Sequence, residues 1–207
     1  MPSPVVFDHP LIRHLVTRLR DTATGATEFR RLVRQVATLM TYEVTRTLET
    51  HAVRVSTPME EANGHRLAGM VTVVPVLRAG LGMAEAVIDL LPDARAGHLG
   101  MARDETTLEP VTYLERLPKD LGAGPVIVVD PMLATGGSAS AAVGVLKRAG
   151  ATDLRMMCLV AAPEGVERLS RDHPDTRVYA AVLDRQLNEQ GFILPGLGDA
   201  GDRLFGT

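Results

Sequence analysis

The sequence predicts an α/β fold with a mostly parallel, doubly wound sheet and flanking helices. Three runs, Met70–Leu77, Val126–Val129 and Leu154–Ala161, are dominated by apolar residues without regular polar alternation. Such runs are typical of strands that are buried on both faces. The helices predicted after these runs span residues 82–91 and 139–148 and a segment that begins at Pro163-Glu164. Because buried strands alternate with helices, we expect βαβ units and a parallel sheet covered on both faces.

Size, charge and cysteine content narrow the class of protein. The 207 residues, 45% of them hydrophobic, fit a single domain (1–207) with a sizeable core. The formal net charge of −3 gives no electrostatic reason to expect nucleic acid as a partner. The single cysteine, Cys158, lies in an apolar strand, which predicts a packing role. No signal-peptide pattern or membrane-length apolar run is present, so we expect a cytoplasmic protein that does not bind a membrane.

Residues 1–50 predict a helical arm that precedes the sheet. Asp8 and Pro10 indicate a helix start, and Leu11, Leu15 and Leu19 follow at four-residue spacing. A longer helix then carries one apolar stripe, formed by Phe29, Leu32, Val33, Val36, Met40, Val44 and Leu48. The arm is expected to pack on the domain or on a second subunit, and its apolar faces suit a homo-oligomer, either a dimer or a larger assembly.

Between the arm and the core motifs the pattern is less regular. His51–Thr57 alternates like a strand of a peripheral sheet, and Asn63-Gly64 indicates a turn. Pro75 is expected to end its strand, because proline cannot donate to a sheet ladder. No spacing of His, Cys or Asp indicates a metal site held by the protein. Further strands are predicted at Ala94–Met101, Val111–Leu117 and Val178–Leu183.

The stretch 126–138 predicts a binding site for a sugar phosphate. A buried strand ends at Asp130, and a loop containing Thr135–Ser138 leads into the next helix. Unpaired N–H groups at a helix N-terminus attract phosphate, glycines let it approach closely, and hydroxyl groups add donors. Asp130 would repel a phosphate, so it is placed to accept hydrogen bonds from sugar hydroxyls or to hold a metal-bound water. The alternative interpretation is an ordinary strand-to-helix turn that needs glycine for its geometry.

Two common phosphate-binding loops are excluded. A P-loop has lysine directly before its Ser or Thr, whereas Gly137 precedes Ser138, and the dinucleotide fingerprint has three spaced glycines. A second loop, Arg78-Ala79-Gly80, follows another buried strand and offers a guanidinium group suited to phosphate. A salt bridge at the sheet edge is the alternative role for Arg78. Two such loops on neighbouring strands predict a ligand with phosphates at both ends.

Two further segments are expected to complete the site. Residues 103–117 combine the polar run Arg103–Pro110 with a returning strand, which makes them a candidate lid hairpin or, alternatively, a solvated turn. The tail, 184–207, is expected to bind the base, and its glycine-rich part, 191–207, is predicted to form neither a regular helix nor a strand. Its apolar residues are expected to be buried; they are Phe192, Ile193, Leu194, Leu197, Leu204 and Phe205. Apolar anchors with exposed backbone suit a planar base, and a backbone N–H aimed at O4 of uracil would reject cytosine.

These motifs resemble those of the uracil phosphoribosyltransferases, from about Glu28 onward. The motifs that carry the resemblance are Val74–Met83, Glu105–Pro110, Asp130–Ser138, Leu159–Gly165 and Gly191–Gly206. The chain departs from the wider pattern at Pro131, where a second acid is usual, and at Ala102, where an aromatic residue is usual. The resemblance implies a type I phosphoribosyltransferase fold and a pentosyltransferase that converts uracil and 5-phosphoribosyl-1-diphosphate (PRPP) into UMP and diphosphate.

The resemblance also implies the residues of the site. The implied PRPP-binding residues are Arg78, Arg103, Asp130, Pro131, Met132, Leu133, Ala134, Thr135, Gly136, Gly137, Ser138 and Asp199. The implied uracil-binding residues are Ile193, Gly198, Asp199 and Ala200. Asp130 and Arg103 are expected to be catalytic, with Mg²⁺ held mainly by PRPP and water. GTP, which activates some relatives, is a candidate allosteric activator. A regulatory protein of the same fold that senses nucleotides, and a phosphoribosyltransferase for another base, remain as alternatives.

Overall fold

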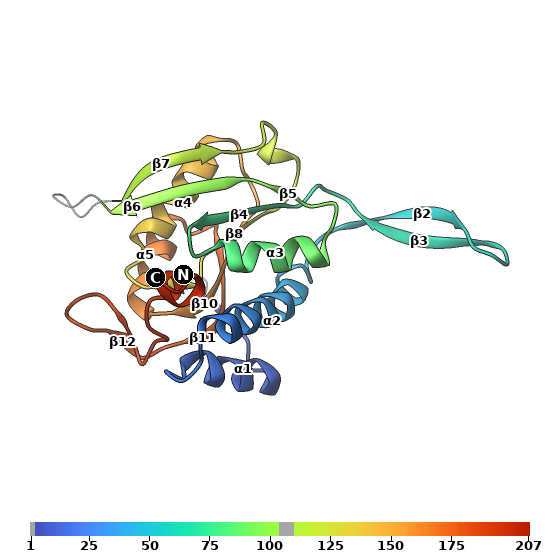
Figure 1. Ribbon diagram of the computed structural model, residues 1–207. Coiled ribbons are helices and arrows are strands. Elements are labelled where there is room, and N and C mark those ends of the chain that lie inside the picture. Colours follow the sequence, from blue (N-terminus) through green and yellow to red (C-terminus); the bar gives the residue numbers. More distant parts are fainter. Residues whose placement is uncertain (1–2, 104–109) are drawn as a thin grey trace.

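The central sheet has nine strands, and its main path runs β1-β11-β10-β8-β4-β6-β7 (Figure 1). A computed structural model describes residues 3–103 and 110–207. The strands are β1 (Val5–Val6), β4 (Thr72–Leu77), β5 (Arg95–Ala96), β6 (His98–Arg103), β7 (Pro110–Arg116), β8 (Val126–Val129), β9 (Met132–Leu133), β10 (Leu154–Ala161) and β11 (Arg177–Leu183). Every pairing in this sheet is parallel except that of β6 with β7. The mostly parallel α/β fold predicted from the sequence is therefore confirmed.

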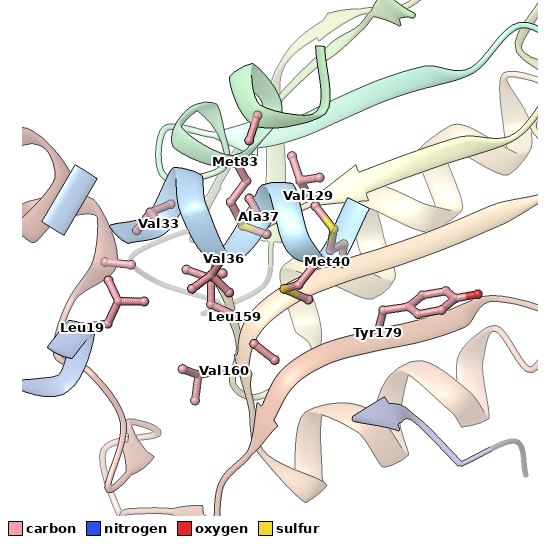
Figure 2. Close-up of a cluster of buried hydrophobic side chains, with 14 of the residues drawn as sticks. Leu19, Val33, Val36, Ala37, Met40, Met83, Val129, Leu159, Val160 and Tyr179 are labelled. Atoms are coloured by element: carbon pink, nitrogen blue, oxygen red, sulfur yellow. The ribbon is translucent and has the colours of Figure 1, made fainter. Parts of the chain in front are cut away.

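Helices cover both faces of the sheet. They are α1 (Pro10–Arg20), α2 (Ala26–Val44), α3 (Leu81–Leu90), α4 (Gly137–Arg148), α5 (Pro163–Asp172) and α6 (Ala200–Phe205), with a 3₁₀ turn at Leu121–Ala123. Residues of β10 alternate between two cores: Met157 and Leu159 face α2, whereas Met156 and Cys158 lie in the core under α4 and α5. Figure 2 shows Val36, Ala37 and Met40 of α2 packed beside Met83 of α3 and Leu159 of β10. No helix in the described part of the chain is both long and apolar enough to cross a membrane.

The N-terminal segment is part of the sheet as well as a pair of helices. Val5 and Val6 pair with β11, which the sequence analysis did not predict. Helix α1 is capped by His9, whose Nδ1 accepts a hydrogen bond from the Leu11 N–H at 3.1 Å, and not by Asp8. Of the three leucines at four-residue spacing, Leu15 and Leu19 are buried, whereas Leu11 is 46% exposed. The buried face of α1 is formed by Ile12, Leu15, Val16 and Leu19.

A two-stranded hairpin projects from the domain (Figure 1). It consists of β2 (Thr50–Ser56) and β3 (Glu61–Leu67), which pair along their whole length. The predicted turn at Asn63-Gly64 is wrong, because Asn63 and Gly64 lie inside β3 opposite Arg54 and Val53. The chain turns at 57–60 instead, where the Thr57 hydroxyl donates to the Glu60 carbonyl and accepts from its N–H.

Pro75 lies within β4 and does not end it. Pro75 pairs with Val129 of β8, and the strand continues to Leu77. On the other side of β4, the Val73 carbonyl accepts from the Gly97 N–H, and Pro75 faces the same side two residues later. The ladder on that side is interrupted between Val73 and Val76. The missing proline N–H therefore falls where the ladder is broken.

The C-terminal tail contains regular structure, contrary to the sequence prediction. A short hairpin forms from β12 (Gln186–Leu187) and β13 (Ile193–Leu194), and α6 follows. Asp199 caps α6 by accepting from the Asp202 N–H, and Gly206 ends it with φ +73°. The burial prediction is partly wrong, because Phe192 and Phe205 are 54% and 42% exposed. The buried apolar anchors of the tail are Ile193, Leu197 and Leu204.

Candidate active site

The two predicted phosphate loops lie side by side. Strands β4 and β8 are parallel neighbours, so their carboxyl ends place Arg78–Gly80 next to Asp130. A Cβ atom on Gly80 would lie 2.3 Å from the Val129 carbonyl oxygen, so only glycine permits this approach. The pairing confirms that both loops follow neighbouring strands. The Gly80 contact also gives that glycine a structural role.

The first loop is held rigidly by the sheet. Within it, Met132 and Leu133 form β9, which pairs with the end of β10. The Pro131 carbonyl accepts from the N–H groups of Leu159 and Val160, each at 3.0 Å. Together these contacts give the loop a fixed shape before any ligand binds.

The loop ends where α4 begins. Gly136 has φ +77°, and α4 starts at Gly137 without a side-chain cap and without an acidic residue in its first turn. The first N–H groups of this 12-residue helix therefore carry partial positive charge without a capping carboxylate. Thr135 and Ser138 add hydroxyl groups at the same place. This arrangement suits a phosphate group.

Asp130 lies at the junction of the two loops with its carboxylate little solvated. Burial raises the pKa of Asp130 to about 7, and a weak hydrogen bond from the Met132 N–H at 3.4 Å opposes the shift only slightly. Cys158 lies nearby in β10, where burial and, secondarily, the Asp130 charge raise the pKa of its thiol. The Cys158 Sγ is 3.6 Å from the Tyr179 carbonyl oxygen. A protonated, fully buried thiol agrees with a packing role.

Arg78 extends from the end of β4 toward the C-terminal helix. Its guanidinium carbon lies 5.5 Å from the centre of the Phe205 ring, and the Arg78 side chain is exposed. Below it, Gly82 of α3 packs against Leu204, where a Cβ atom would come within 3.1 Å of a leucine methyl group. The loop that carries Arg78 therefore meets the tail through α6.

The tail also contacts the first loop. A Cβ atom on Gly191 would lie 3.5 Å from the Thr135 methyl group. Farther along, Gly198 and Asp199 are exposed, and Ile193 and Ala200 are buried. Arg103 is the last residue of β6, whereas residues 104–109 of the candidate lid lie outside the described residues. The structure thus brings Arg78, Asp130–Ser138 and the tail together, and the lid remains a prediction.

Three charged residues that anchor the tail were missed by the sequence analysis: Arg20, Asp184 and Arg203. Arg20 pairs with Asp184 and also donates to the Gly196 carbonyl at 3.0 Å. Arg203 donates to the carbonyl groups of Leu197 at 2.8 Å and Asp21 at 2.7 Å. Burial lowers the pKa of Arg203. These partners are far apart in sequence, so no local pattern could have identified them.

A cavity of about 530 Å³ lies at the opposite, amino end of the sheet strands. Its charged lining residues are Glu49, Asp153, Arg155 and Arg177. Arg155 donates to Asp153 at 2.8 Å and to the Val44 carbonyl at 2.6 Å. The guanidinium group of Arg155 is therefore already bound by protein groups. In the part of the chain that the structure describes, no group of three or more His, Cys, Asp or Glu residues could hold a metal ion.

Comparison with known proteins identifies relatives over the whole chain. The family model for uracil phosphoribosyltransferase matches residues 5–207. The uracil phosphoribosyltransferase of Macrococcus caseolyticus is 57% identical over 203 residues, which cover 98% of this chain and 97% of the relative. That of Bacillus licheniformis is 55% identical over 208 residues, which cover all of both chains.

Solved structures share the fold. The AQ2163 protein from Aquifex aeolicus superposes with a TM-score of 0.93 at 34% identity, covering 98% of each chain. Adenine phosphoribosyltransferase from Trypanosoma brucei superposes with a TM-score of 0.58 at 12% identity, covering 91% of this chain and 86% of that one. At that identity the likeness concerns the fold alone, which is that of the type I phosphoribosyltransferases. From the family model and its close relatives, the chain belongs to the uracil phosphoribosyltransferase family.

Proposed function

We propose that the protein transfers the phosphoribosyl group of PRPP to uracil, giving UMP and diphosphate. Family membership supports this reaction, and one structural observation carries it. The two phosphate-competent loops lie at the adjoining carboxyl ends of β4 and β8, and the tail packs on both of them. A site with two anion-binding ends and an apolar, backbone-rich wall suits PRPP and a planar base.

Each part of PRPP is assigned to the loop whose charge and hydrogen-bonding groups suit it. The N–H groups at the start of α4 and the hydroxyls of Thr135 and Ser138 hold the 5-phosphate, and Asp130 accepts hydrogen bonds from the ribose hydroxyls. Arg78 and Arg103 bind the diphosphate. The proposed PRPP-binding residues are Arg78, Arg103, Asp130, Pro131, Met132, Leu133, Ala134, Thr135, Gly136, Gly137, Ser138 and Asp199. Uracil is proposed to contact Ile193, Gly198, Asp199 and Ala200, largely through backbone groups.

Catalysis follows from where charge develops in the reaction. As the bond to diphosphate breaks, the leaving group gains negative charge and the ribose carbon becomes oxocarbenium-like. The guanidinium groups of Arg78 and Arg103 stabilise the departing anion. An ionised Asp130 holds the ribose and lies on the side of the developing positive charge. The tail holds the base so that its nitrogen is in line with the bond that breaks.

The residues of the proposed site suit a Mg²⁺ ion that enters bound to PRPP. Asp130 is a lone carboxylate at the junction of the loops, and Pro131 follows it where a second acid is usual. Mg²⁺ prefers one or two carboxylates together with phosphate oxygens and water. When bound with PRPP, the ion would neutralise diphosphate charge, and oxygens of PRPP and water would supply most of its ligands.

Base selectivity is proposed to come from backbone donors. Gly198 and Asp199 are exposed, and their N–H groups donate to no other residue that the structure describes. A donor that meets O4 of uracil would lose its acceptor if cytosine, with an amino group there, took its place. A buried unpaired donor costs about 1–3 kcal/mol, which corresponds to roughly 5- to 150-fold selectivity.

A homo-oligomer, cytoplasmic location and activation by GTP are further parts of the proposal. Exposed apolar residues on the projecting hairpin favour association; Met59 at its tip is 91% exposed. Light scattering on the purified protein tests the assembly. The rate of UMP formation with and without GTP tests the activation.

The reaction is tested by measuring UMP formed from uracil, PRPP and Mg²⁺ by the wild type and by Asp130→Asn. The variant removes the charge but keeps the shape, so we expect turnover to fall at least about 100-fold. Asp120→Asn is the matched control, because Asp120 forms an exposed ion pair with Arg95 before β8. Near-normal turnover in Asp130→Asn would remove Asp130 from the mechanism. Absence of UMP in the wild type would refute the reaction.

A further inference from the structure

Arg20, Asp184 and Gly196 form a closed hydrogen-bond network that joins helix α1 to the tail. Asp184 follows β11 and accepts from the Gly196 N–H through Oδ2 at 2.9 Å. Arg20, the last residue of α1, binds both carboxylate oxygens of Asp184, with a distance of 3.0 Å from Nη1 to Oδ2. The same Nη1 donates to the Gly196 carbonyl at 3.0 Å. Both backbone hydrogen-bonding groups of Gly196 are therefore used.

This network is buried. The Asp184 side chain is 4% exposed and the Arg20 side chain 23% exposed. A buried ion pair of this kind costs desolvation energy, and replacing it with apolar residues is often neutral or stabilising. Stability alone therefore gives no clear reason for the pair, whereas a need to fix one conformation of the tail does.

The network fixes the part of the tail that faces the proposed base site. Gly196 has φ +64° and folds back so tightly that a Cβ atom would lie 2.3 Å from the Ile193 carbonyl oxygen. The next carbonyl, that of Leu197, accepts from Arg203 at 2.8 Å. With these groups engaged, the exposed N–H groups of Gly198 and Asp199 are the ones left to meet a ligand.

We propose that Arg20 and Asp184 are positioning residues that determine base specificity. They engage the N–H and C=O of Gly196, and this fixes which backbone groups of the tail face the base and where those groups point. Helix α1 therefore contributes to base recognition through Arg20, although it lies far from the tail in sequence. This inference rests on the proposed function, because it assumes that the tail binds uracil.

The proposal predicts that the network affects the binding of uracil much more than the binding of PRPP. Of the residues proposed to bind PRPP, all but Asp199 lie at the end of β6 or in the loops after β4 and β8, and the network contacts none of these. Base binding depends on the angle of a few N–H groups, and hydrogen bonds weaken steeply as that angle departs from linearity. Loosening Gly196 should therefore change the KM for uracil and leave that for PRPP unaltered.

The test compares three variants with the wild type in initial-rate assays. Arg20→Lys keeps the charge and loses the forked geometry, and Asp184→Asn keeps the shape and loses the charge. The double variant Arg20→Met with Asp184→Leu removes the network without leaving an unpaired buried charge, so it is expected to fold. Thermal unfolding of each variant checks this. In the folded variants we expect the KM for uracil to rise about tenfold and the KM for PRPP to change less than about twofold.

The selectivity for uracil over cytosine is a second measurement, and the loss of a merely structural contact would not change it. The ratio of kcat/KM for uracil to that for cytosine should fall by about tenfold in Asp184→Asn, because the donor aimed at O4 is no longer fixed. Arg20→Lys should lose less selectivity than Asp184→Asn, because lysine keeps the charge and can still donate to this network. A uracil KM within twofold of the wild type in a folded variant, or an equal rise in both KM values, would overturn the inference.

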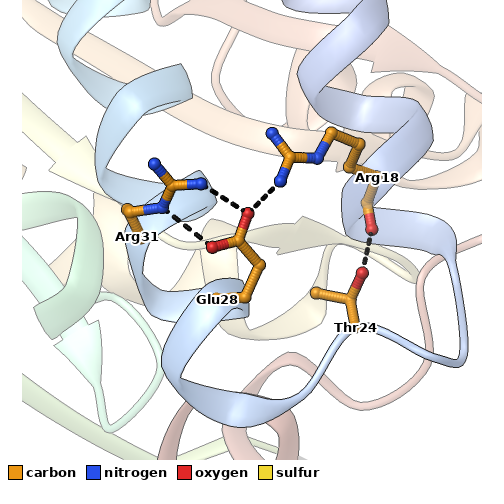
Figure 3. A network of polar contacts seen from close by, with 4 residues as sticks. All are labelled: Arg18, Thr24, Glu28 and Arg31. Atoms are coloured by element: carbon orange, nitrogen blue, oxygen red, sulfur yellow. Dashed lines mark hydrogen bonds and ion pairs between the residues drawn. The ribbon is translucent and has the colours of Figure 1, made fainter.

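Arg18 provides the matched control on the same helix. Its side chain pairs with Glu28, which Arg31 also binds at 2.7 Å (Figure 3), and in the part of the chain that the structure describes neither the Arg18 nor the Glu28 side chain hydrogen-bonds to the tail. Arg18→Met is expected to leave both KM values unchanged. If the wild type forms no UMP, the proposed function fails. If the wild type is active and the network variants match Arg18→Met, only the positioning role fails.

Discussion

Gly136 lies against Gly165, so closely that a Cβ atom on Gly136 would be 2.8 Å from the Gly165 carbonyl oxygen. In the reverse direction, a Cβ atom on Gly165 would lie 2.3 Å from the Ala134 carbonyl oxygen. The first phosphate loop and the start of α5 therefore touch through their backbones. Two glycines, 29 positions apart by their numbers, set the position of the loop.

Gly136→Ala is expected to destabilise the protein by about 2–4 kcal/mol and to raise the KM for PRPP. The left-handed conformation alone costs about 1–2 kcal/mol for alanine, and the contact with Gly165 adds to it. Urea unfolding and initial rates measure the two effects. Gly150→Ala is the control, because Gly150 also has positive φ (+97°) but a Cβ atom there would meet no heavy atom within 4 Å. Equal effects of both variants would show that the Gly165 contact contributes nothing.

Asp130→Asn is expected to stabilise the ligand-free protein above pH 7 while lowering its activity. Burial raises the pKa of Asp130 from 3.8 to about 7. Between these two pH values the carboxyl group is protonated in the folded state and ionised in the unfolded state. Stability from this group is complete below about pH 4 and is lost as the pH rises toward 7. Partial solvent access limits the gain in the asparagine variant to the order of 2 kcal/mol at pH 8. Urea unfolding at pH 4, 6 and 8 checks this, and a pH-independent difference between the two proteins would contradict it.

The same titration predicts a pH dependence of the reaction. An ionised Asp130 accepts hydrogen bonds from both ribose hydroxyls, whereas a protonated one donates through its O–H and so loses one acceptor. We expect kcat/KM for PRPP to rise with pH through about 7 and then level off. Asp120→Asn should keep this profile. A flat profile between pH 5.5 and about 8.5 in the wild type would remove Asp130 ionisation from the mechanism.

Arg78→Lys is expected to raise the KM for PRPP about tenfold without changing the free energy of unfolding. The side chain is exposed and contacts the Phe205 face, so its loss opens no core cavity. A lysine keeps the charge and loses the forked donor geometry. Arg148→Lys, at an exposed position on α4, serves as the control. A raised KM for uracil alone would place Arg78 at the base and not at the diphosphate.

Arg203→Met is expected to cost about 2–4 kcal/mol of stability. The substitution leaves carbonyl groups of Leu197 and Asp21 without their donor and removes a guanidinium group stacked 4.3 Å from the centre of the Phe29 ring. Chemical unfolding measures the loss. Arg185→Met, an exposed arginine of the tail, is the control and should change stability by less than about 0.5 kcal/mol.

The buried strands and the phosphate loops were predictable because their signals are local. Residues 154–161 were predicted as a strand and form β10 with the same bounds. The order of strand, acid, glycine loop and helix at 126–148 also appears as β8, Asp130, the loop and α4. In both cases the hydrophobic pattern and the glycines specify structure over a few neighbouring residues.

The elements predicted wrongly depend on partners elsewhere in the chain. Asn63-Gly64 has the composition of a turn, but pairing along the whole hairpin places it inside a strand. The tail was predicted to lack regular structure, yet Asp199 and Gly206 cap a helix that Arg30 holds by donating to the Leu204 carbonyl at 2.8 Å. The pair of Arg20 with Asp184 joins residues 164 positions apart. Local propensity carries no information on such contacts.

The most direct test is a competition assay with one protein sample, PRPP, Mg²⁺ and equal concentrations of uracil, cytosine, hypoxanthine and orotate. Separation of the nucleotides by chromatography shows which base receives the phosphoribosyl group. We predict UMP as the dominant product, with equimolar diphosphate and at most a minor share of product from the other three bases. A dominant product from another base would contradict the assignment of the tail to uracil. Bound PRPP without any nucleotide formed would contradict the enzyme assignment itself.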